Sequence, residues 1–227
     1  NLGYFDNRVS YILTIGKHKA EVDYIVEPGK AYRLNSFFRE PADTALKPLI
    51  DTLVSQNQAY RLWWPVNLNA LNDAKDELAI ELRDRGYYDA SPDLFRYEID
   101  TLADKKEGAV FLKLNNPLNQ TKFQRYKFGA TYLNIICSDI YLENQWPKSY
   151  SSKGKHFQLN HYPIKGNIME QVVSIDSGNW FSQSVTNQTY VALVEMGLFS
   201  YVDLHQEVDT TNHLIITKIE AKAIPRI

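Results

Sequence analysis

Acidic side chains form the group of residues in this sequence that comes closest to a pattern for catalysis. Two carboxylates held together in a pocket can act as general acid and general base. Glu81 lies four residues before Arg85, so this pair is expected to form a helical ion pair worth about 0.3–0.5 kcal/mol. Because Lys75 and Arg83 are interleaved with the acids, we interpret the segment as the solvated face of a helix. Its carboxylates are Asp73, Asp76, Glu77, Glu81 and Asp84.

No other set of residues has the spacing of a catalytic or metal site. Cys137 is the single cysteine, which excludes an internal disulfide and a site of several thiolates, and its apolar surroundings predict a buried structural thiol. The sequence has no glycine-rich phosphate loop, no nucleophile elbow and no zinc-protease motif. We therefore expect no enzyme, no cofactor and no metal. The histidines lack ligand spacing: His18, His156, His161, His205 and His213.

Composition and charge narrow the class of protein. The chain has 227 residues, of which 44% are hydrophobic and 23% charged, as is ordinary for globular domains. The 25 Lys and Arg residues nearly balance the 27 Asp and Glu residues and form no basic stripe, so we expect no nucleic-acid partner. No apolar run approaches the roughly 20 residues of a membrane-spanning helix.

An aromatic cluster at Tyr60, Trp63 and Trp64 allows two interpretations. In the first, these rings cover the end of a two-helix layer and are part of the core. In the second, they form an exposed patch that binds a partner.

The stretch from 68 to 114 predicts the elements that position these residues. Asn67 or Asn69 can cap a helix, and Gly86 can end it in a left-handed conformation. The charged residues discussed above occupy the other sides of this helix. Steps of three, four and four place its apolar residues on one face: Leu71, Ala74, Leu78 and Leu82.

Two strands follow this helix, since the pattern changes to a period of two. A polar turn at 104–108 separates them, which predicts an antiparallel hairpin beneath the helix. In the strand at 94–102 the inward set is Phe95, Tyr97 and Ile99, and the outward set is Arg96, Glu98 and Asp100. In the second strand the inward set is Val110, Leu112 and Leu114.

The same order of elements recurs along the chain. Gly3, Gly86 and Gly197 are each followed by large apolar residues and then by two strands. A strand at 31–39 and a helix at 44–55 precede the central helix, which completes a β-α-α-β-β unit. In the last unit we expect a strand at 126–136, helices at 167–173 and 184–196, and strands at 201–206 and 213–221.

We therefore predict an α+β fold of tandem β-α-α-β-β modules, with small mixed sheets that are each covered by two helices. Residues 1–28 are the C-terminal part of one module, 29–117 a complete module and 118–227 the final module. An insertion near 138–165 interrupts the final module, with a hairpin turn at 153–155.

Several segments together resemble the POTRA modules that precede the barrel of BamA/TamA-type outer-membrane assembly proteins. They are Gly-Lys-Ala-Tyr-Arg-Leu (29–34), Leu-Arg-Asp-Arg-Gly-Tyr-Tyr (82–88), Val-Asp-Tyr-Ile-Val-Glu-Pro-Gly (22–29) and Thr-Tyr-Val-Ala-Leu-Val-Glu-Met-Gly-Leu-Phe (189–199). The resemblance extends over nearly the whole chain and is nearest to the TamA-like branch of Bacteroidetes. It implies a periplasmic array attached to the outer membrane, a covalently linked C-terminal β-barrel, and unfolded outer-membrane protein precursors or accessory envelope subunits as partners.

In such modules an edge strand can pair with an extended peptide through backbone hydrogen bonds, which tolerate many sequences. We expect these edges at 9–15, 94–102 and 201–206. The central candidate comprises Leu94, Phe95, Arg96, Tyr97, Glu98, Ile99 and Asp100. Two alternatives remain: a structural scaffold of an envelope complex that binds no client, and a hydrolase, which would require two carboxylates in a deep pocket.

Overall fold

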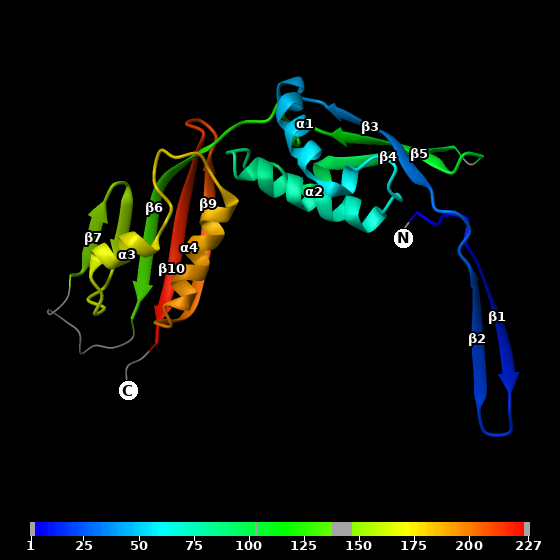
Figure 1. The fold of residues 1–227 in the computed structure, drawn as a ribbon. Helices are drawn as coiled ribbons and strands as arrows, with labels where there is room; N and C mark the ends of the chain where they lie inside the picture. The colour runs from blue at the N-terminus through cyan, green and yellow to red at the C-terminus, as the bar shows by residue number, and fades with distance from the viewer. Residues whose placement is uncertain (1–2, 103, 138–146, 225–227) are drawn as a thin grey trace. The chain divides into compact units, whose positions relative to one another are not determined.

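The computed structural model describes residues 3–102, 104–137 and 147–224 (Figure 1). The chain divides into two units. The first comprises Asn1–Ala79 and Ser91–Lys122, and the second comprises Ile80–Ala90 and Phe123–Ile227. The last turn of the central helix is thus counted with the second unit.

The first unit has the predicted β-α-α-β-β order. Its strands form a mixed sheet in the order β3-β5-β4, with β3 parallel and β4 antiparallel to β5, and both helices lie on one face of this sheet (Figure 1). The elements are β3 (Arg33–Pro41), α1 (Lys47–Gln56), α2 (Leu68–Arg83), β4 (Phe95–Leu102) and β5 (Glu107–Leu114). Short 3₁₀ turns occupy Thr44–Leu46, Gln58–Tyr60 and Pro92–Leu94.

Helix α2 has the face and the ends that its sequence predicts. Its four predicted core residues are at most 2% exposed. The Asn67 side chain caps the helix by accepting hydrogen bonds from the backbone N–H groups of Asn69 and Ala70 (3.1 and 3.2 Å). At the other end, Gly86 has a φ of 95°, and the Tyr87 N–H donates to the carbonyl of Leu82 (3.1 Å), which is a Schellman stop.

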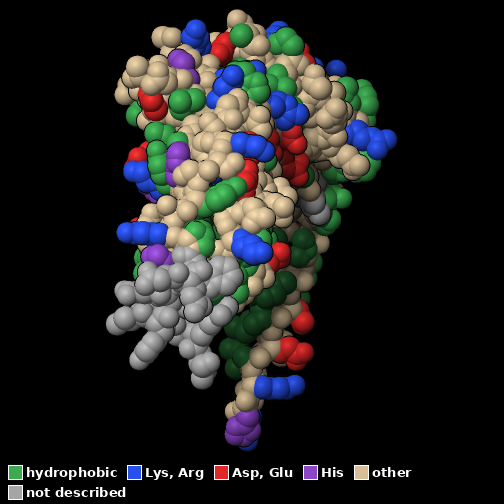
Figure 2. Space-filling model, turned by 90° about the vertical axis from the view of Figure 1, so that its left-hand side faces the viewer, with side chains coloured by type: hydrophobic (Ala, Val, Ile, Leu, Met, Phe, Trp, Pro, Cys, Tyr) green, Lys and Arg blue, Asp and Glu red, His purple; other side chains and the backbone are tan. Residues whose placement is uncertain are grey.

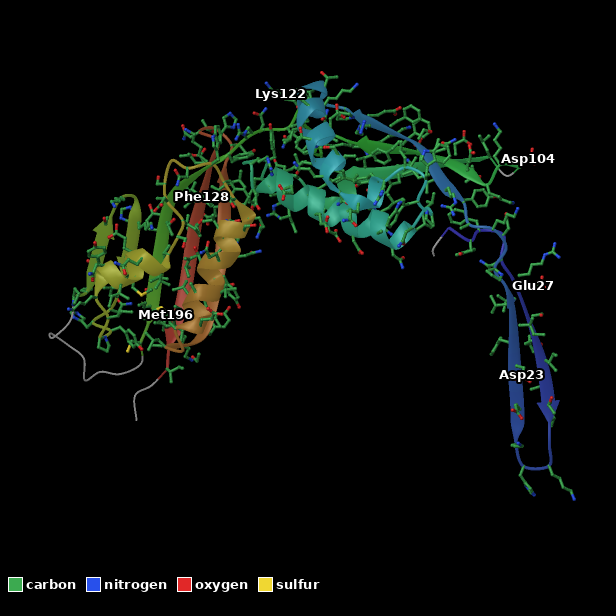
Figure 3. All side chains as sticks on the ribbon, viewed as in Figure 1. Asp23, Glu27, Asp104, Lys122, Phe128 and Met196 are labelled. Atoms are coloured by element: carbon green, nitrogen blue, oxygen red, sulfur yellow. The ribbon has the colours of Figure 1, made fainter. Side chains whose placement is uncertain are left out.

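An antiparallel hairpin precedes this module, with β1 (Arg8–Ile15) paired to β2 (Ala20–Glu27). Every residue of both strands is exposed, and Figure 3 shows side chains leaving the hairpin on both faces. One face is apolar: Val9, Tyr11, Leu13, Ile15, Ala20, Val22, Tyr24 and Val26. A two-stranded ribbon is only marginally stable by itself, so this face requires a covering layer for stability.

The second unit is a larger version of the same architecture. Its mixed sheet has the strand order β7-β8-β6-β10-β9. The elements are β6 (Lys127–Ile136), β7 (Ser149–Ser152), β8 (Lys155–Gln158), α3 (Gly166–Val172), α4 (Gln183–Glu195), β9 (Phe199–Asp209) and β10 (Leu214–Ala223). Met169 of α3 and Leu193 of α4 belong to one buried cluster with strand residues, so both helices cover the same face. Cys137 is partly buried against this cluster.

The segment near 138–165 contributes to the sheet. Its turn lies at Lys153 and Gly154, as predicted, and both residues have positive φ (47° and 79°). β8 then pairs in parallel with β6 over four residues, which adds two strands beside β6. Phe157 and Leu159 are at most 1% exposed, so the hairpin belongs to the core. Residues 138–146 lie outside the described part of the chain.

Charges are mixed on the surface. On the face shown in Figure 2, Lys and Arg side chains are interspersed with Asp and Glu side chains. No helix in the described part of the chain is both long and apolar enough to cross a membrane.

Candidate functional site

The free edge of β4 is the strongest candidate for a binding site. β4 lies at one end of the strand order β3-β5-β4, which confirms the edge position predicted for this strand. β9 likewise ends the order of the second sheet. Leu94, however, lies in a 3₁₀ turn that begins at Pro92, so the strand starts at Phe95 rather than at Leu94.

The register shows which backbone groups are free. The Asn115 N–H donates to the carbonyl of Leu94 (2.9 Å), so this pair is hydrogen-bonded. Leu114, the partner of Phe95, instead directs its carbonyl away from β4, because it accepts from the Ala42 N–H on the other side of β5 (2.8 Å). Bonded and non-bonded pairs alternate in an antiparallel ladder. The residues of β4 that bond to β5 are therefore Arg96, Glu98, Asp100 and Leu102. Tyr97, Ile99 and Thr101 direct N–H and C=O groups toward the free side, and Phe95 directs its C=O there, since the Phe95 N–H donates to the Pro92 carbonyl.

A groove runs beside this edge on the helix-covered face. One recess of about 380 Å³ lies between β4 and α2, where Leu68 and Leu71 are joined by Phe95, Tyr97 and Ile99. A second recess of about 310 Å³ shares Leu68 and Ile99 and continues the groove at the other end of β4. Phe95 is 3% exposed and forms the floor, so the groove can receive apolar side chains from a strand added to the edge.

Charged side chains occupy the opposite face of β4. Lys113 of β5 donates to Glu98 (2.6 Å), and this hydrogen bond lowers the pKa of the Glu98 carboxyl below its usual value. Arg96 lies 3.8 Å from the same carboxylate. These charges oppose indiscriminate pairing at the edge, since an added strand must match them.

The predicted aromatic patch does not form as a single exposed surface. Tyr60 is 6% exposed and packs against Phe37, and its hydroxyl bonds to that of Tyr97 (2.5 Å). Burial raises the pKa of Tyr60 to about 12. Tyr60 is therefore a core residue, as the first interpretation has it. The prediction of an exposed patch is wrong for Tyr60, whereas Trp63 and Trp64 are 58% and 50% exposed.

Trp63 and its neighbours cover part of the other edge of the sheet. Trp63 N–H donates to the carbonyl of Leu34 (2.6 Å), and Leu34 N–H donates to that of Trp64 (2.9 Å). The first residues of β3 are thus already paired on their outer side, which leaves β4 as the more open edge. A recess of about 320 Å³ beside the remainder of β3 is lined by Phe37 and Arg39 of β3 and Val54 of α1.

Trp63 has a φ of 67°, a left-handed conformation that costs an L-residue roughly 1–2 kcal/mol. We expect Trp63→Gly to be about 1 kcal/mol more stable than Trp63→Ala, because both variants lose the same ring but only glycine tolerates this φ. At Trp64 the order should reverse, with glycine about 0.5–1 kcal/mol less stable than alanine. Chemical denaturation of the four variants tests this, and the same order at both positions would contradict the left-handed geometry.

A constellation of hydrogen-bonded residues around Tyr32, at the start of the first unit, was not predicted from the sequence. Gly3 has a φ of 80°, and its carbonyl accepts from the Tyr32 N–H (2.9 Å). The Tyr32 carbonyl accepts in turn from the Val66 N–H (2.9 Å), and the Tyr32 hydroxyl donates to Asp6 (3.1 Å). Lys106, in the β4–β5 turn with a φ of 54°, pairs with Asp6 (2.5 Å) and lies over the Tyr32 ring.

The second unit repeats this constellation with different residues. The Gly86 carbonyl accepts from the Tyr126 N–H (2.8 Å), and the Tyr126 carbonyl accepts from the Phe181 N–H (3.0 Å). Burial and a hydrogen bond to Asp89 raise the pKa of Tyr126. His213, with a φ of 53°, takes the place of the turn lysine against the Tyr126 ring. The sequence contains one signal of this repeat, which is an aspartate three residues after both Gly3 and Gly86.

Asp84 caps helix α4 of the second unit. Its carboxylate accepts hydrogen bonds from the Ser182 hydroxyl (2.9 Å), the Ser184 N–H (2.8 Å) and the Ser184 hydroxyl (2.6 Å). Burial opposes ionisation of Asp84, but these hydrogen bonds outweigh it and lower the pKa of the carboxyl below its usual value. A negative charge at this position also stabilises the helix dipole.

This geometry predicts a pH dependence of stability. A group whose pKa is lowered by folding stabilises the fold above its unfolded pKa, about 4 for aspartate, and this stability is lost as pH falls through the folded pKa. We expect Asp84→Asn to lower the free energy of unfolding by about 1 kcal/mol at pH 7 and to flatten its decline below about pH 4. Asp73→Asn, an exposed change on α2, is the control and should alter stability by less than about 0.5 kcal/mol. Equal pH profiles for Asp84→Asn and the unaltered chain would contradict this account.

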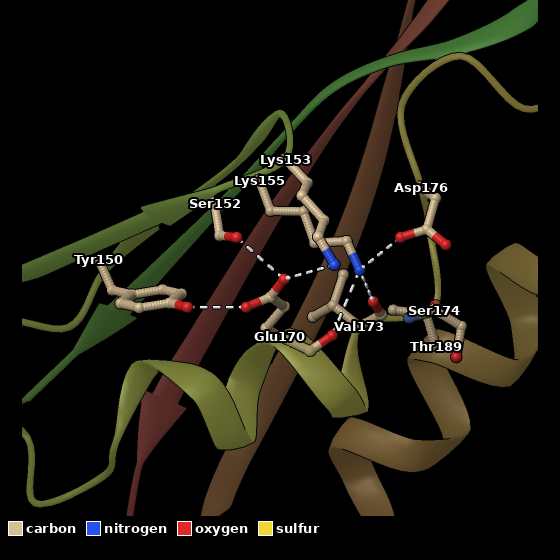
Figure 4. A network of polar contacts seen from close by, with 9 residues as sticks. All are labelled: Tyr150, Ser152, Lys153, Lys155, Glu170, Val173, Ser174, Asp176 and Thr189. Atoms are coloured by element: carbon tan, nitrogen blue, oxygen red, sulfur yellow. Dashed lines mark hydrogen bonds and ion pairs between the residues drawn. The ribbon is translucent and has the colours of Figure 1, made fainter.

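In the second unit, β6 is not a free edge because β8 pairs with it. The hairpin that contains β8 is held by Lys155, which is 3% exposed (Figure 4). Its ammonium group donates to the carbonyls of Val173 (2.5 Å) and Glu170 (3.2 Å) at the end of α3 and pairs with Asp176 (2.9 Å). Tyr150 adds a hydrogen bond from β7 to the Glu170 carboxylate (2.7 Å). β9 is therefore the long free edge of this unit.

The described residues contain no group of three or more His, Cys, Asp or Glu side chains that could hold a metal ion. The recesses beside β3 and β4 bring no two carboxylates together, since Asp6 is the single acidic residue that lines them.

Comparison with solved structures identifies the fold. Over 98% of this chain and 74% of that one, the chain is similar to POTRA domains 3–5 of BamA from Haemophilus influenzae, with 15% identity and a TM-score of 0.55. It is also similar to BamA from Haemophilus ducreyi lacking POTRA domains 1–3 (10% identity, TM-score 0.57), over 85% of this chain and 30% of that one. No family model matches the sequence. No curated protein matches it either.

The chain therefore has an α+β fold of repeated β-α-α-β-β units like those of POTRA domains, with small mixed sheets. Its similarity to the POTRA domains of BamA is one of structure.

Proposed function

We propose that this chain is a non-catalytic, peptide- and protein-binding array of POTRA modules from a BamA/TamA-type factor for outer-membrane protein assembly or translocation. The observation that carries this proposal is the β4 edge, where Tyr97, Ile99 and Thr101 offer backbone N–H and C=O groups to the free side next to an apolar groove. An extended segment of a client or an accessory subunit would extend the sheet there.

The remaining parts of the proposal follow from the same fold. We assign 1–28 to the end of one module, 29–117 to a complete module and 118–227 to a module that leads toward a covalently linked β-barrel. The array would lie in the periplasm, attached to the outer membrane, with unfolded outer-membrane protein precursors or accessory envelope subunits as partners. The narrower TamA-like assignment is supported by the sequence segments that resemble that branch.

A proline at a free-side position of β4 tests the binding mode. Ile99→Pro removes an N–H that points away from β5 and leaves the β4–β5 ladder intact, whereas Ile99→Ala shortens the side chain but keeps the N–H. We expect Ile99→Pro to bind an unfolded outer-membrane protein precursor about tenfold more weakly than Ile99→Ala, which corresponds to one lost hydrogen bond of about 1.4 kcal/mol. Fluorescence anisotropy measures both affinities.

Asp100→Pro is the structural control, because it removes an N–H that bonds to β5 and should lower the melting temperature instead. Equal affinities of Ile99→Pro and Ile99→Ala would overturn binding at the β4 edge.

A further inference from the structure

We propose that the groove between α2 and β4 selects extended peptides with apolar side chains at alternate positions facing α2 and one acidic side chain opposite Lys75. This inference rests on the proposed function and specifies the ligand of the same site.

The apolar preference follows from the groove floor. Phe95 and Leu71 are 3% and 2% exposed and form the floor of the recess between β4 and α2. Leu68 and Ile99 line both this recess and the second one beside it. Side chains of an added strand alternate between the two faces of the sheet, so every second residue would enter this groove. Each buried methylene group contributes roughly 0.8 kcal/mol, which favours valine, leucine or phenylalanine at these positions.

The acidic preference follows from the charges at the Phe95 end of the groove. Lys75 and Asn72 of α2 line this end, and the Lys75 ammonium lies 5.8 Å from the centre of the Tyr97 ring. Within the described part of the chain, no carboxylate lies within ion-pair distance of Lys75. Arg96 does not add to this charge, because its guanidinium lies on the other face of β4, 3.8 Å from the Glu98 carboxylate. A carboxylate would therefore gain charge-assisted hydrogen bonds here, and a basic side chain would be repelled.

The opposite end of the groove has no comparable excess of charge. Asp6 lies there, but Lys106 pairs with it (2.5 Å) and the Tyr32 hydroxyl donates to it (3.1 Å). Because one end is cationic and the other is neutralised, an acidic side chain also fixes the direction and register of the bound peptide.

Binding of matched synthetic peptides tests this inference. β4 has eight residues, so we would use eight-residue peptides that alternate valine and threonine. Glutamate replaces the first groove-facing valine in one peptide and the last in another, so that neither strand direction is assumed. Each glutamate peptide is compared with a control peptide that has glutamine at the same position. We expect one glutamate peptide to bind about five times more tightly than its glutamine partner, as for an exposed ion pair, and the preference to decline at high salt.

The variants separate the inference from the proposed function. In Lys75→Gln the preference for glutamate should disappear, whereas Lys105→Gln, an exposed change in the β4–β5 turn, should retain it. A preference that survives Lys75→Gln, or glutamate and glutamine peptides that bind equally, would overturn the inference and leave binding at the edge intact. If none of the peptides binds, the proposed edge-binding function itself fails.

Discussion

Replacing Lys155 with methionine should lower the free energy of unfolding of the chain by about 3 kcal/mol. The Lys155 side chain is 4% exposed, and its ammonium group satisfies the carbonyls of Glu170 and Val173 as well as the Asp176 carboxylate. Methionine has similar length but no donor, so it leaves acceptors at the end of α3 without their partner. A hydrogen bond to a charged group contributes about 1.5–3 kcal/mol, and loss of several accounts for the effect.

Lys153→Met is the matched control, since that side chain is 83% exposed and lies 3.9 Å from Glu170. It should change stability by less than about 0.5 kcal/mol. Urea denaturation followed by circular dichroism measures both variants. Similar losses for the two would show that Lys155 does not hold the hairpin to α3.

Replacing Gly86 with alanine should cost a similar amount, about 3 kcal/mol. Gly86 has a φ of 95°, which is strained for any residue with a Cβ, by roughly 1–2 kcal/mol. An added Cβ would also lie 3.1 Å from the Tyr126 carbonyl oxygen and 3.3 Å from the Trp180 ring. This overpacking adds about 1–3 kcal/mol, because the backbone that it meets is held by the hydrogen bond from Tyr126 to Gly86.

Gly197→Ala provides the comparison, because Gly197 has a φ of 66° but no atom within 4 Å of an added Cβ. It should cost only the conformational part, about 1 kcal/mol. Thermal unfolding of both variants in the same buffer tests the difference. If Gly86→Ala costs no more than Gly197→Ala, the close approach of Tyr126 to Gly86 contributes nothing to stability.

Local patterns predicted most of the elements because their causes are local. The buried face of α2, its cap at Asn67 and its stop at Gly86 all depend on residues within a few positions of one another. The alternation in β4 and β5 similarly reflects one covered face. These features therefore survive in the sequence without knowledge of the tertiary contacts.

The features that were missed depend on contacts between distant residues. The sequence left Tyr60 open between the core and an exposed patch, because its hydroxyl contact with Tyr97, 37 positions away, has no local pattern. The parallel pairing of β8 with β6 involves residues more than 20 positions apart, so the segment around it was described as a polar insertion. The sequence of a short strand with alternating polar residues does not specify which strand it pairs with.

The candidate site was predicted in part. The edge strand could be located because the strand that follows the helix stop was expected to lie at the edge of the sheet in a β-α-α-β-β module, and β4 does lie there. Lys75 was assigned only to the solvated face of a helix, since its position beside Tyr97 appears only when α2 is packed on the sheet. The Tyr32 and Lys106 constellation was missed for the same reason, because its residues come from three separate segments.

Amide hydrogen exchange along β4, measured by NMR with and without a bound extended peptide, tests the central claim most directly. In the free protein the N–H groups of Arg96, Glu98 and Asp100 should exchange slowly because they bond to β5, and those of Tyr97 and Ile99 should exchange quickly. Peptide binding should protect Tyr97 and Ile99 and leave the other three unchanged. Binding that protects neither Tyr97 nor Ile99 would contradict the account.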